Sequence, residues 1–309
     1  MRFRTDFPSS QSKKRDDPES DVTFNTGYAH ERPAGRRFIR AYTIVITLAL
    51  GLVVGIILAL TGAGGGILAV PLLIFGVGLS VAEAGPIGLL AVGLAAAFGA
   101  GLGLKAGTVR YKAALLMAGS GIVFSPLGSW LARRMDNRWL GVLFAVVLLF
   151  VAYRTFQKAQ AEPPDTEPGN HQAPPCLRDA DSGRFVWTTR CARAMALSGT
   201  VAGLLSGLLG VGGGFVLVPA LQRYTDLAMQ SVMATSLAVI ALVSVGGVLS
   251  SALAGHLNWG IAIPFCGGAL AGMMGGRLIA SRLAGPQLPK GFAAISVWVA
   301  IGMMGKSFL

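Results

Sequence analysis

Charged residues are scarce in this chain. Only 13% of the 309 residues are Asp, Glu, Lys or Arg, whereas 53% are hydrophobic, and the mean hydropathy is +0.62. Too few polar side chains remain to cover a water-soluble surface. This shortage excludes an ordinary soluble domain and indicates an all-α protein that crosses the membrane several times.

Carboxylates are almost absent from the apolar part of the chain. Of the fourteen acidic residues, six lie in residues 1–40 and five in residues 161–190. The other three, Glu83, Asp136 and Asp226, sit at the ends of predicted spans. Cation transport and carboxylate-based proton coupling usually need acidic groups inside the spans. The absence of such acidic groups therefore argues against cation transport and against proton coupling through carboxylates.

Metal-binding and catalytic motifs are also missing. The three cysteines show no CxxC spacing, and the three histidines lie far apart in sequence. Neither HExxH nor GxSxG occurs, so no nucleophile, base or metal cluster is expected within the spans. We therefore expect no metal site, no bound cofactor and no enzymatic activity.

Basic residues give the chain a formal net charge of +12 and a pI near 10.3. No basic run is interleaved with aromatic residues on a soluble domain, so we expect no nucleic-acid partner and interpret the charges as flanks of membrane spans. Residues 1–40 hold nine Lys/Arg and six Asp/Glu and are predicted to be a disordered tail. Arg36, Arg37 and Arg40 directly precede the first apolar run, which predicts a cytoplasmic N-terminus.

Eight apolar runs predict about eight transmembrane helices, because roughly 20 residues cross a hydrocarbon core as a helix. We divide them into a first transmembrane repeat (41–158), a polar linker (159–192) and a second transmembrane repeat (193–309). The runs cover residues 41–60, 84–104, 113–131, 140–153, 194–209, 231–254, 261–280 and 292–304.

An internal duplication supports this division. The sequence LTGAGGGILAVPLL at residues 60–73 returns as LLGVGGGFVLVPAL at residues 208–221, so that each glycine triplet and its following proline recur after 148 residues. Further glycines recur at the same offset, including Gly51 with Gly199 and Gly55 with Gly203. Tetrapeptide pairs such as Gly51-xxx-Gly55 are interpreted as helix-packing positions.

Each glycine triplet predicts a break in a helix, because glycine has the largest backbone entropy cost and no side chain to pack. The apolar piece at residues 66–77 would cover only about 18 Å as a helix, too short for a full crossing. Two arrangements remain open. If the short piece returns to its own side, both termini and the linker are cytoplasmic, which the flanking charges favour; if it completes a crossing, the repeats are inverted.

The paired motifs resemble a known family. GxGGGxxxxP occurs early in each half, followed later by Gly107-Thr-Val-Arg-Tyr111 and by Gly255-His-Leu-Asn-Trp259. This arrangement, over residues 41–304, is similar to the TauE/SafE sulfite-exporter family, also called TSUP transporters. The resemblance implies a multi-pass carrier of the cell inner membrane for sulfite, sulfonates or related organosulfur anions, without a cofactor. Ala234-Thr-Ser-Leu237 of the second half holds two hydroxyls, whereas the corresponding region of the first half, Ile87-Gly-Leu-Leu90, holds none, so any hydroxyl contribution there would come from one half only.

The physical argument also favours an anion. Glycines at the start of a half-helix expose unpaired N–H groups at the positive end of the helix dipole. Hydroxyls and an arginine inside an apolar run could add donors. The candidate substrate ligands are Thr61, Gly64, Gly65, Gly66, Gly212, Gly213, Gly214, Thr235, Ser236 and Arg277.

Structural roles stay open for all of these residues. The glycines could serve close helix packing, the hydroxyls could bond their neighbouring backbone, and Arg277 could be an interfacial anchor. At the level of the whole protein, a membrane scaffold or a partner subunit of a larger complex is the alternative to a transporter. The expected partners are a small anion and the lipid bilayer, with a homo-oligomer possible.

Overall fold

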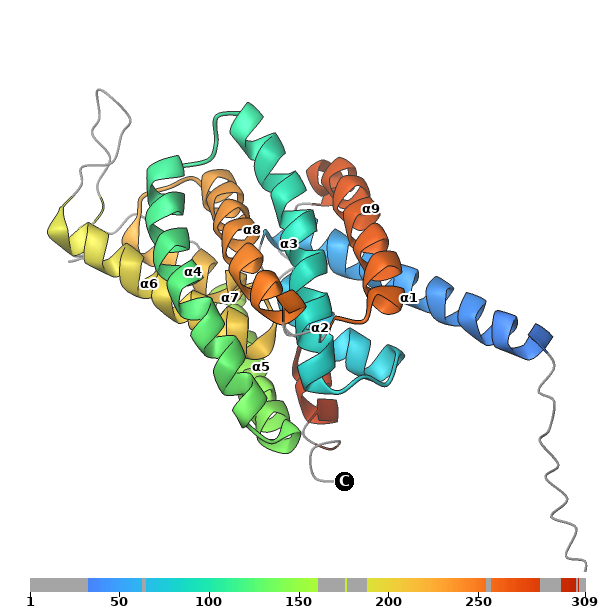
Figure 1. The fold of residues 1–309 in the computed structure, drawn as a ribbon. Helices are drawn as coiled ribbons and strands as arrows, with labels where there is room; N and C mark the ends of the chain where they lie inside the picture. The colour runs from blue at the N-terminus through green and yellow to red at the C-terminus, as the bar shows by residue number, and fades with distance from the viewer. Residues whose placement is uncertain are drawn as a thin grey trace, which may run out of the picture.

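The computed structural model describes residues 33–62, 65–160, 176, 188–253, 257–283, 296–303 and 305. Most of the predicted tail and of the polar linker therefore lies outside the described residues. Within them the protein is a bundle of helices, and a further helical stretch covers residues 296–303 (Figure 1). The labelled helices are α1 (Pro33–Thr61), α2 (Gly65–Gly76), α3 (Val81–Lys105), α4 (Tyr111–Arg134), α5 (Asn137–Gln160), α6 (Thr189–Leu209), α7 (Gly214–Tyr224), α8 (Met229–Leu253) and α9 (Trp259–Leu283).

Six of these helices are long and apolar enough to cross a membrane: α1 from Tyr42, α3, α4, α6, α8 and α9 up to Leu278. They coincide with six of the eight predicted runs. The predicted run 140–153 falls in α5, whose apolar part, Arg138–Tyr153, is shorter than the other six. The run 292–304 is described only in part. Eight full-length spans are thus not observed among the described residues.

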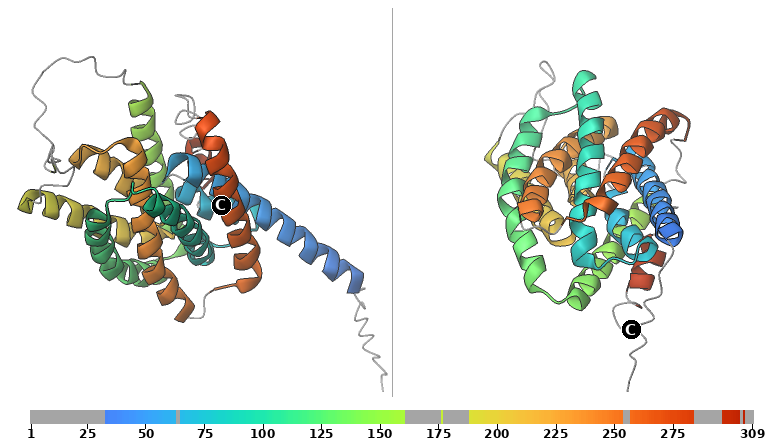
Figure 2. Two further views of the ribbon diagram at one scale, coloured as in Figure 1. Left: turned by 90° about the horizontal axis from the view of Figure 1, so that it is seen from above. Right: turned by 45° about the vertical axis from the view of Figure 1, so that its right-hand side comes forward.

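The short helices α2 and α7 have 12 and 11 residues and follow the glycine triplets. Helix α1 begins at Pro33, earlier than the first apolar run, and proline is favoured at a first helical position. Figure 2 shows the first half of α1 extending away from the bundle. Helix α3 begins with a capping box in which the Ser80 and Glu83 side chains each bond the other's backbone N–H.

Helix bounds keep the 148-residue spacing of the sequence motifs. Helices α3 and α8 begin at Val81 and Met229, and both have 25 residues. Helices α4 and α9 likewise begin 148 residues apart, at Tyr111 and Trp259. The two helices that precede the glycine turns, α1 and α6, end at Thr61 and Leu209. The same order of helices is therefore found in both halves.

The halves exchange helices when they pack. Helix α1 packs on α9 of the other half, and α6 packs on α4. At the first interface, a Cβ on Gly51 would collide with the carbonyl of Phe265, and a Cβ on Gly55 with that of Ala269. The backbones approach this closely only because both positions are glycine, so the predicted packing role of this pair is confirmed.

The second interface repeats these contacts. A Cβ on Gly203 would collide with the backbone of Gly121, and a Cβ on Gly207 with the carbonyl of Ser125. Gly203 lies 148 residues after Gly55, and Gly121 lies 148 residues before Ala269, so equivalent atoms meet in both interfaces. Helices α4 and α6 thus form the counterpart of α9 and α1.

Helices α3 and α8 pack against each other at the centre and run in opposite directions. At the middle of α3, Gly93 lies against Ser244; near its end, Gly103 lies against Ala234. The residue number in α8 falls as the residue number in α3 rises, so the two helices are antiparallel. Because α3 and α8 are equivalent helices, the two halves of the bundle are oriented oppositely (Figure 1).

Candidate functional site

The first glycine turn joins α1 to α2. Gly62 has φ +71°, the left-handed conformation that glycine adopts without steric cost, and its N–H donates to the Leu58 carbonyl at 2.9 Å. Helix α2 then runs back along α1, because Gly65 lies against Leu58 and Gly76 against Leu50. The α1 helix therefore ends inside the bundle and the chain reverses, as predicted for a glycine break.

The second glycine turn joins α6 to α7 in the same way. Gly210 has φ +71° and donates its N–H to the Ser206 carbonyl at 2.8 Å. Gly212 and Gly213 follow with φ +77° and +67°, and Gly213 is the residue that caps α7. Side chains with a Cβ would be strained at all three positions.

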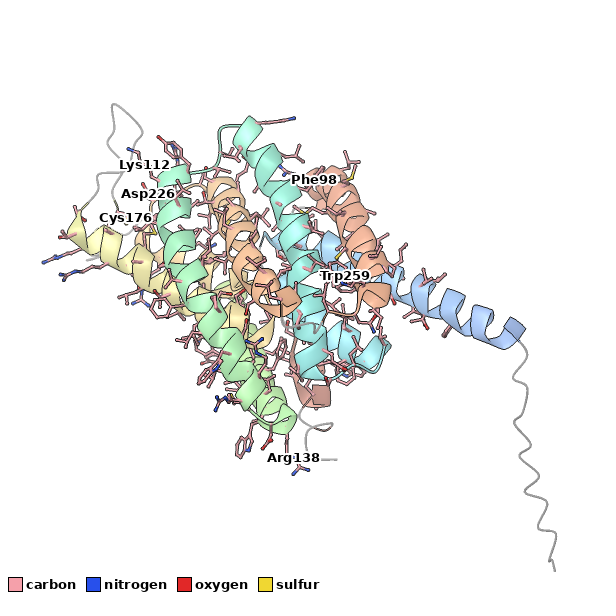
Figure 3. All side chains as sticks on the ribbon, in the orientation of Figure 1. Phe98, Lys112, Arg138, Cys176, Asp226 and Trp259 are labelled. Carbon is pink, nitrogen blue, oxygen red and sulfur yellow. A yellow bond between two sulfur atoms is a disulfide. The ribbon has the colours of Figure 1, made fainter. Side chains whose placement is uncertain are left out.

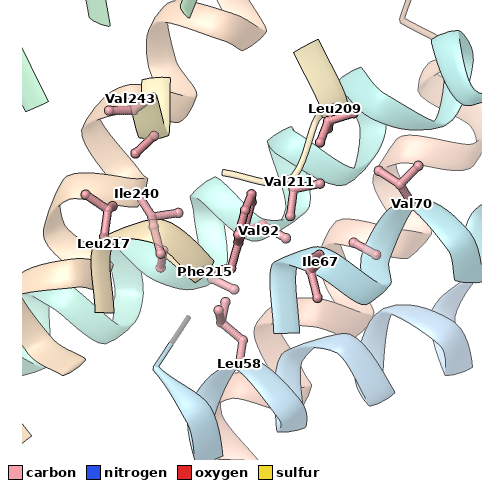
Figure 4. Close-up of a cluster of buried hydrophobic side chains, with 14 of the residues drawn as sticks. Leu58, Ile67, Val70, Val92, Leu209, Val211, Phe215, Leu217, Ile240 and Val243 are labelled. Carbon is pink, nitrogen blue, oxygen red and sulfur yellow. The ribbon is translucent and has the colours of Figure 1, made fainter. Parts of the chain in front are cut away.

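The two turns meet in the interior. A Cβ on Gly66, the second residue of α2, would collide with the carbonyl of Val211 in the second turn. Val92 of α3 contacts both turns. Its Cγ1 atom lies 3.2 Å from where a Cβ on Gly66 would stand and 3.3 Å from where a Cβ on Gly212 would stand. Figure 4 shows the buried apolar residues around this meeting point, which we call the glycine junction.

Both short helices begin at the glycine junction. The first amides of any α-helix have no acceptor four residues earlier, and the helix dipole places partial positive charge there. In α7, the first amide with a hydrogen bond in the described backbone is that of Val216, which donates to the Gly213 carbonyl at 3.1 Å. Two helix N-termini with donor amides are thus directed into one buried region.

Most of the predicted glycine ligands have a packing role. Gly65, Gly66 and Gly213 are buried, and at each the direction of a Cβ is filled by protein backbone. An alanine at Gly65, Gly66 or Gly213 would therefore collide with the protein backbone. Gly214 is buried as the first residue of α7, and Gly64 lies outside the described residues.

The predicted hydroxyls bond the protein itself. Thr61 donates to the Ile57 carbonyl at 2.7 Å, in its own helix. Ser236 of α8 lies 2.9 Å from the Met233 carbonyl and 3.1 Å from the Gly62 carbonyl, so it touches the first glycine turn from the other half.

Thr235 belongs to α8 but lies away from the glycine turns, next to the residue that precedes α4. It is buried and its Oγ1 accepts the N–H of Arg110, the residue that precedes α4, at 3.1 Å. The structure therefore brings Ser236 to the first turn and uses Thr235 to fix the α3–α4 connection.

Arg277 is half-buried in α9, inside an otherwise apolar run. Its Nη1 donates to the Gly99 carbonyl of α3 at 2.9 Å. A guanidinium has five N–H donors, so this bond uses one of them and fixes the direction of the side chain. The charge points inward to α3, which disagrees with a purely interfacial anchor.

Two features were missed in the sequence. Gly62 and Gly210 end α1 and α6, and their 148-residue spacing was a signal that could have identified them beside the triplets. The second feature is a disulfide between Cys176 and Cys191, 15 residues apart. Spacing alone does not reveal such a pair, because no short cysteine motif is present.

The disulfide joins the described part of the linker to the start of α6. Cys176 also donates its N–H to the Tyr224 carbonyl at the end of α7, at 3.2 Å. Figure 3 shows Cys176 at the same end of the bundle as Lys112 and Asp226, and Arg138 at the opposite end. In the residues that the structure describes, no group of three or more His, Cys, Asp or Glu could hold a metal ion.

Comparison with known proteins agrees with a membrane transporter. A family model described as "Sulfite exporter TauE/SafE" matches residues 47–303. A probable membrane transporter protein of Xylella fastidiosa is 31% identical over 272 residues, which cover 86% of this chain and 97% of the relative. The probable membrane transporter protein YunE of Bacillus subtilis is 29% identical over 242 residues, which cover 74% of this chain and 86% of the relative. No solved structure matches the chain. The chain is therefore a multi-pass membrane protein and belongs to the TauE/SafE sulfite exporter family.

Proposed function

We propose that the protein carries a small oxyanion, sulfite, a sulfonate or a related organosulfur anion, across the cell inner membrane through the glycine junction. The observation that carries this proposal is the meeting of two helix N-termini, those of α2 and α7, at one buried place. Unpaired amides and the positive ends of two dipoles favour negative charge there. Binding sites of this kind are typical of transporters with broken helices.

The charges nearby support an anion. Helix α2 is without charged residues, and in the described spans the acidic side chains lie at helix ends, as Glu83 does at the start of α3. Arg277 brings a positive charge into the apolar run of α9, and its bond to Gly99 directs it toward α3. We assign Arg277 to the transport path and the N–H groups at the glycine turns to the anion.

We further propose that the halves are homologous repeats of inverted topology. Helices α3 and α8 hold equivalent positions and run antiparallel, and α2 runs back along α1, so that α1 and α2 together return to the side from which α1 enters. The N-terminus then lies in the cytoplasm and the linker on the opposite face. The Cys176–Cys191 disulfide supports this, because disulfides persist in oxidising compartments. Two inverted halves around one site are suited to alternating access.

Flux measurements test the function directly. Purified protein in proteoliposomes should release preloaded sulfite or methanesulfonate faster than empty liposomes do, and sulfate in parallel reports the selectivity. Repeating the assay with and without a pH gradient shows whether protons are coupled. Folded protein that moves none of these anions would contradict the proposal and favour a scaffold or subunit role.

A further inference from the structure

Three buried serines have hydroxyls without a hydrogen-bond partner among the described residues: Ser125 of α4, Ser206 of α6 and Ser244 of α8. The exposed fractions of their side chains are 0%, 0% and 2%. Serine in a membrane helix normally bonds a carbonyl one turn earlier, as Ser198 does with Ala194 at 2.8 Å. These three hydroxyls depart from that rule.

The three serines lie on the helices that pack beside the second glycine turn. The Ser244 Oγ lies 3.9 Å from the position of a Cβ on Gly212, within van der Waals reach of the turn. The Ser125 Oγ lies 3.0 Å from where a Cβ on Gly247 would stand. Gly247 follows Ser244 by about one turn of α8. Ser206 accepts the Gly210 N–H with its own carbonyl. The three hydroxyls thus belong to three helices, α4, α6 and α8, that pack on one another beside the second glycine turn.

The fold itself does not need these hydroxyls. The positions 148 residues away in the other half, at the first glycine turn, are Leu58, Ala96 and Met273, and all three are apolar. Leu58 and Met273 are buried, as the serines are. The equivalent buried positions are therefore filled by side chains without polar oxygen atoms. A buried hydroxyl without a partner destabilises a protein, so three of them on helices that pack on one another call for a ligand.

We propose that Ser125, Ser206 and Ser244 form a hydroxyl pocket that binds the oxygens of the transported oxyanion. This inference rests on the proposed function and locates its binding site on one side of the pseudo-symmetric bundle. Each hydroxyl can donate one hydrogen bond to a sulfite or sulfonate oxygen, and the nearby α7 N-terminus adds amide donors. Neutral donors suit a carrier, because binding must remain weak enough for release on the other side.

The proposal predicts opposite effects on stability and on transport. Ser→Ala removes a buried hydroxyl without a partner and adds no volume, so each variant should melt at an equal or higher temperature than the wild type. Each lost neutral hydrogen bond should weaken binding of sulfite or methanesulfonate about two- to tenfold. The triple variant S125A/S206A/S244A should therefore lose roughly two orders of magnitude in affinity if the effects add. Ser198→Ala, in α6 but bonded to its own helix, is the matched control and should keep the wild-type affinity.

Two measurements on detergent-purified protein decide the question: the melting temperature without anion, and its increase on adding sulfite or methanesulfonate. A higher melting temperature with a smaller anion-induced increase supports the pocket. Lower stability with an unchanged anion-induced increase would mean that the hydroxyls hold structural water, and it overturns the pocket. Unchanged flux in the triple variant, with active wild type, overturns the pocket but leaves anion transport intact. A wild type without flux or anion-induced increase contradicts the proposed function itself.

Discussion

The two glycine turns begin with equivalent left-handed glycines, Gly62 and Gly210, but have different side chains around them. At the first turn, the Gly62 carbonyl lies 3.1 Å from the Ser236 hydroxyl. At the second, the equivalent carbonyl of Gly210 lies against Gly88, the residue 148 positions before Ser236, 3.4 Å from where a Cβ would stand. The first turn is fixed by a side chain from the other half, whereas the second is without that bond. Equivalent glycines can therefore have different hydrogen-bond partners.

Reporter fusions should give the largest effect, because each reporter is either active or inactive on a given side of the membrane. They test whether the two halves have opposite orientations. Opposite orientation of the halves predicts that a reporter inserted at Gly169 is active only outside the cytoplasm. Reporters at Met1 and after Leu309 should be active only inside it. A cytoplasmic Gly169 together with a cytoplasmic Met1 would refute the inverted topology.

Valine at the exchanged interfaces should give the next largest effect. Gly203→Val and Gly55→Val should both abolish recovery of folded protein, because each side chain would collide with backbone that cannot move aside. The control is Gly119→Val, on an exposed face of α4 where a Cβ would meet nothing within 4 Å. Fluorescence-detected size-exclusion chromatography measures the recovery. Equal yields for Gly203→Val and Gly119→Val would contradict the close packing of α4 on α6.

Loss of the disulfide should destabilise only the end of the bundle that holds the linker. Cys176→Ser should lower the free energy of unfolding by about 3 kcal/mol, the cost expected for opening a loop of this length. Melting curves with and without reductant measure it. The double variant with Cys191→Ser should match the single variant, and reductant should have no further effect on either. An additive loss in the double variant would argue that the cysteines act separately.

Removing the inward charge of α9 should lower anion affinity about ten- to a hundredfold, the range for one charge-assisted hydrogen bond. Arg277→Gln should raise the KM for sulfite flux, and Arg277→Lys should restore part of the loss because it keeps the charge. Arg133→Gln, on an exposed face of α4, is the control and should leave KM unchanged. If Arg277→Gln and Arg133→Gln behave alike, Arg277 lies outside the transport path.

The smallest effect concerns the bond that distinguishes the two turns. Ser236→Ala should lower the free energy of unfolding by about 1 kcal/mol, because the Gly62 carbonyl would lose its buried donor. Ser120→Ala, whose hydroxyl bonds carbonyls of its own helix, should cost less. Chemical unfolding in mixed micelles can resolve the two. An equal loss of unfolding free energy in Ser236→Ala and Ser120→Ala would show that the bond to the Gly62 carbonyl does not stabilise the first turn.

Sequence patterns predicted the helical class, six of the long helices, both glycine breaks and the family. These features depend on local composition and on short motifs with a fixed spacing. The site was predicted less well. Nothing in the sequence indicates that Ser236 bonds the turn of the other half, because this contact depends on the packing of α8 across the bundle on α3. Ser206 and Ser244 gave no signal, since burial and loss of a partner arise only from packing.

The exchanged packing has a consequence for synthesis in the cell. The glycine face of α1 that carries Gly51 and Gly55 finds its partner only in α9, more than two hundred residues later in the chain. Until α9 has been made and inserted, that face must be covered by lipid or by an insertion factor. The N-terminal half is therefore an incomplete folding unit. Two halves made as separate chains should assemble only when both are present, each supplying the helix that the other lacks.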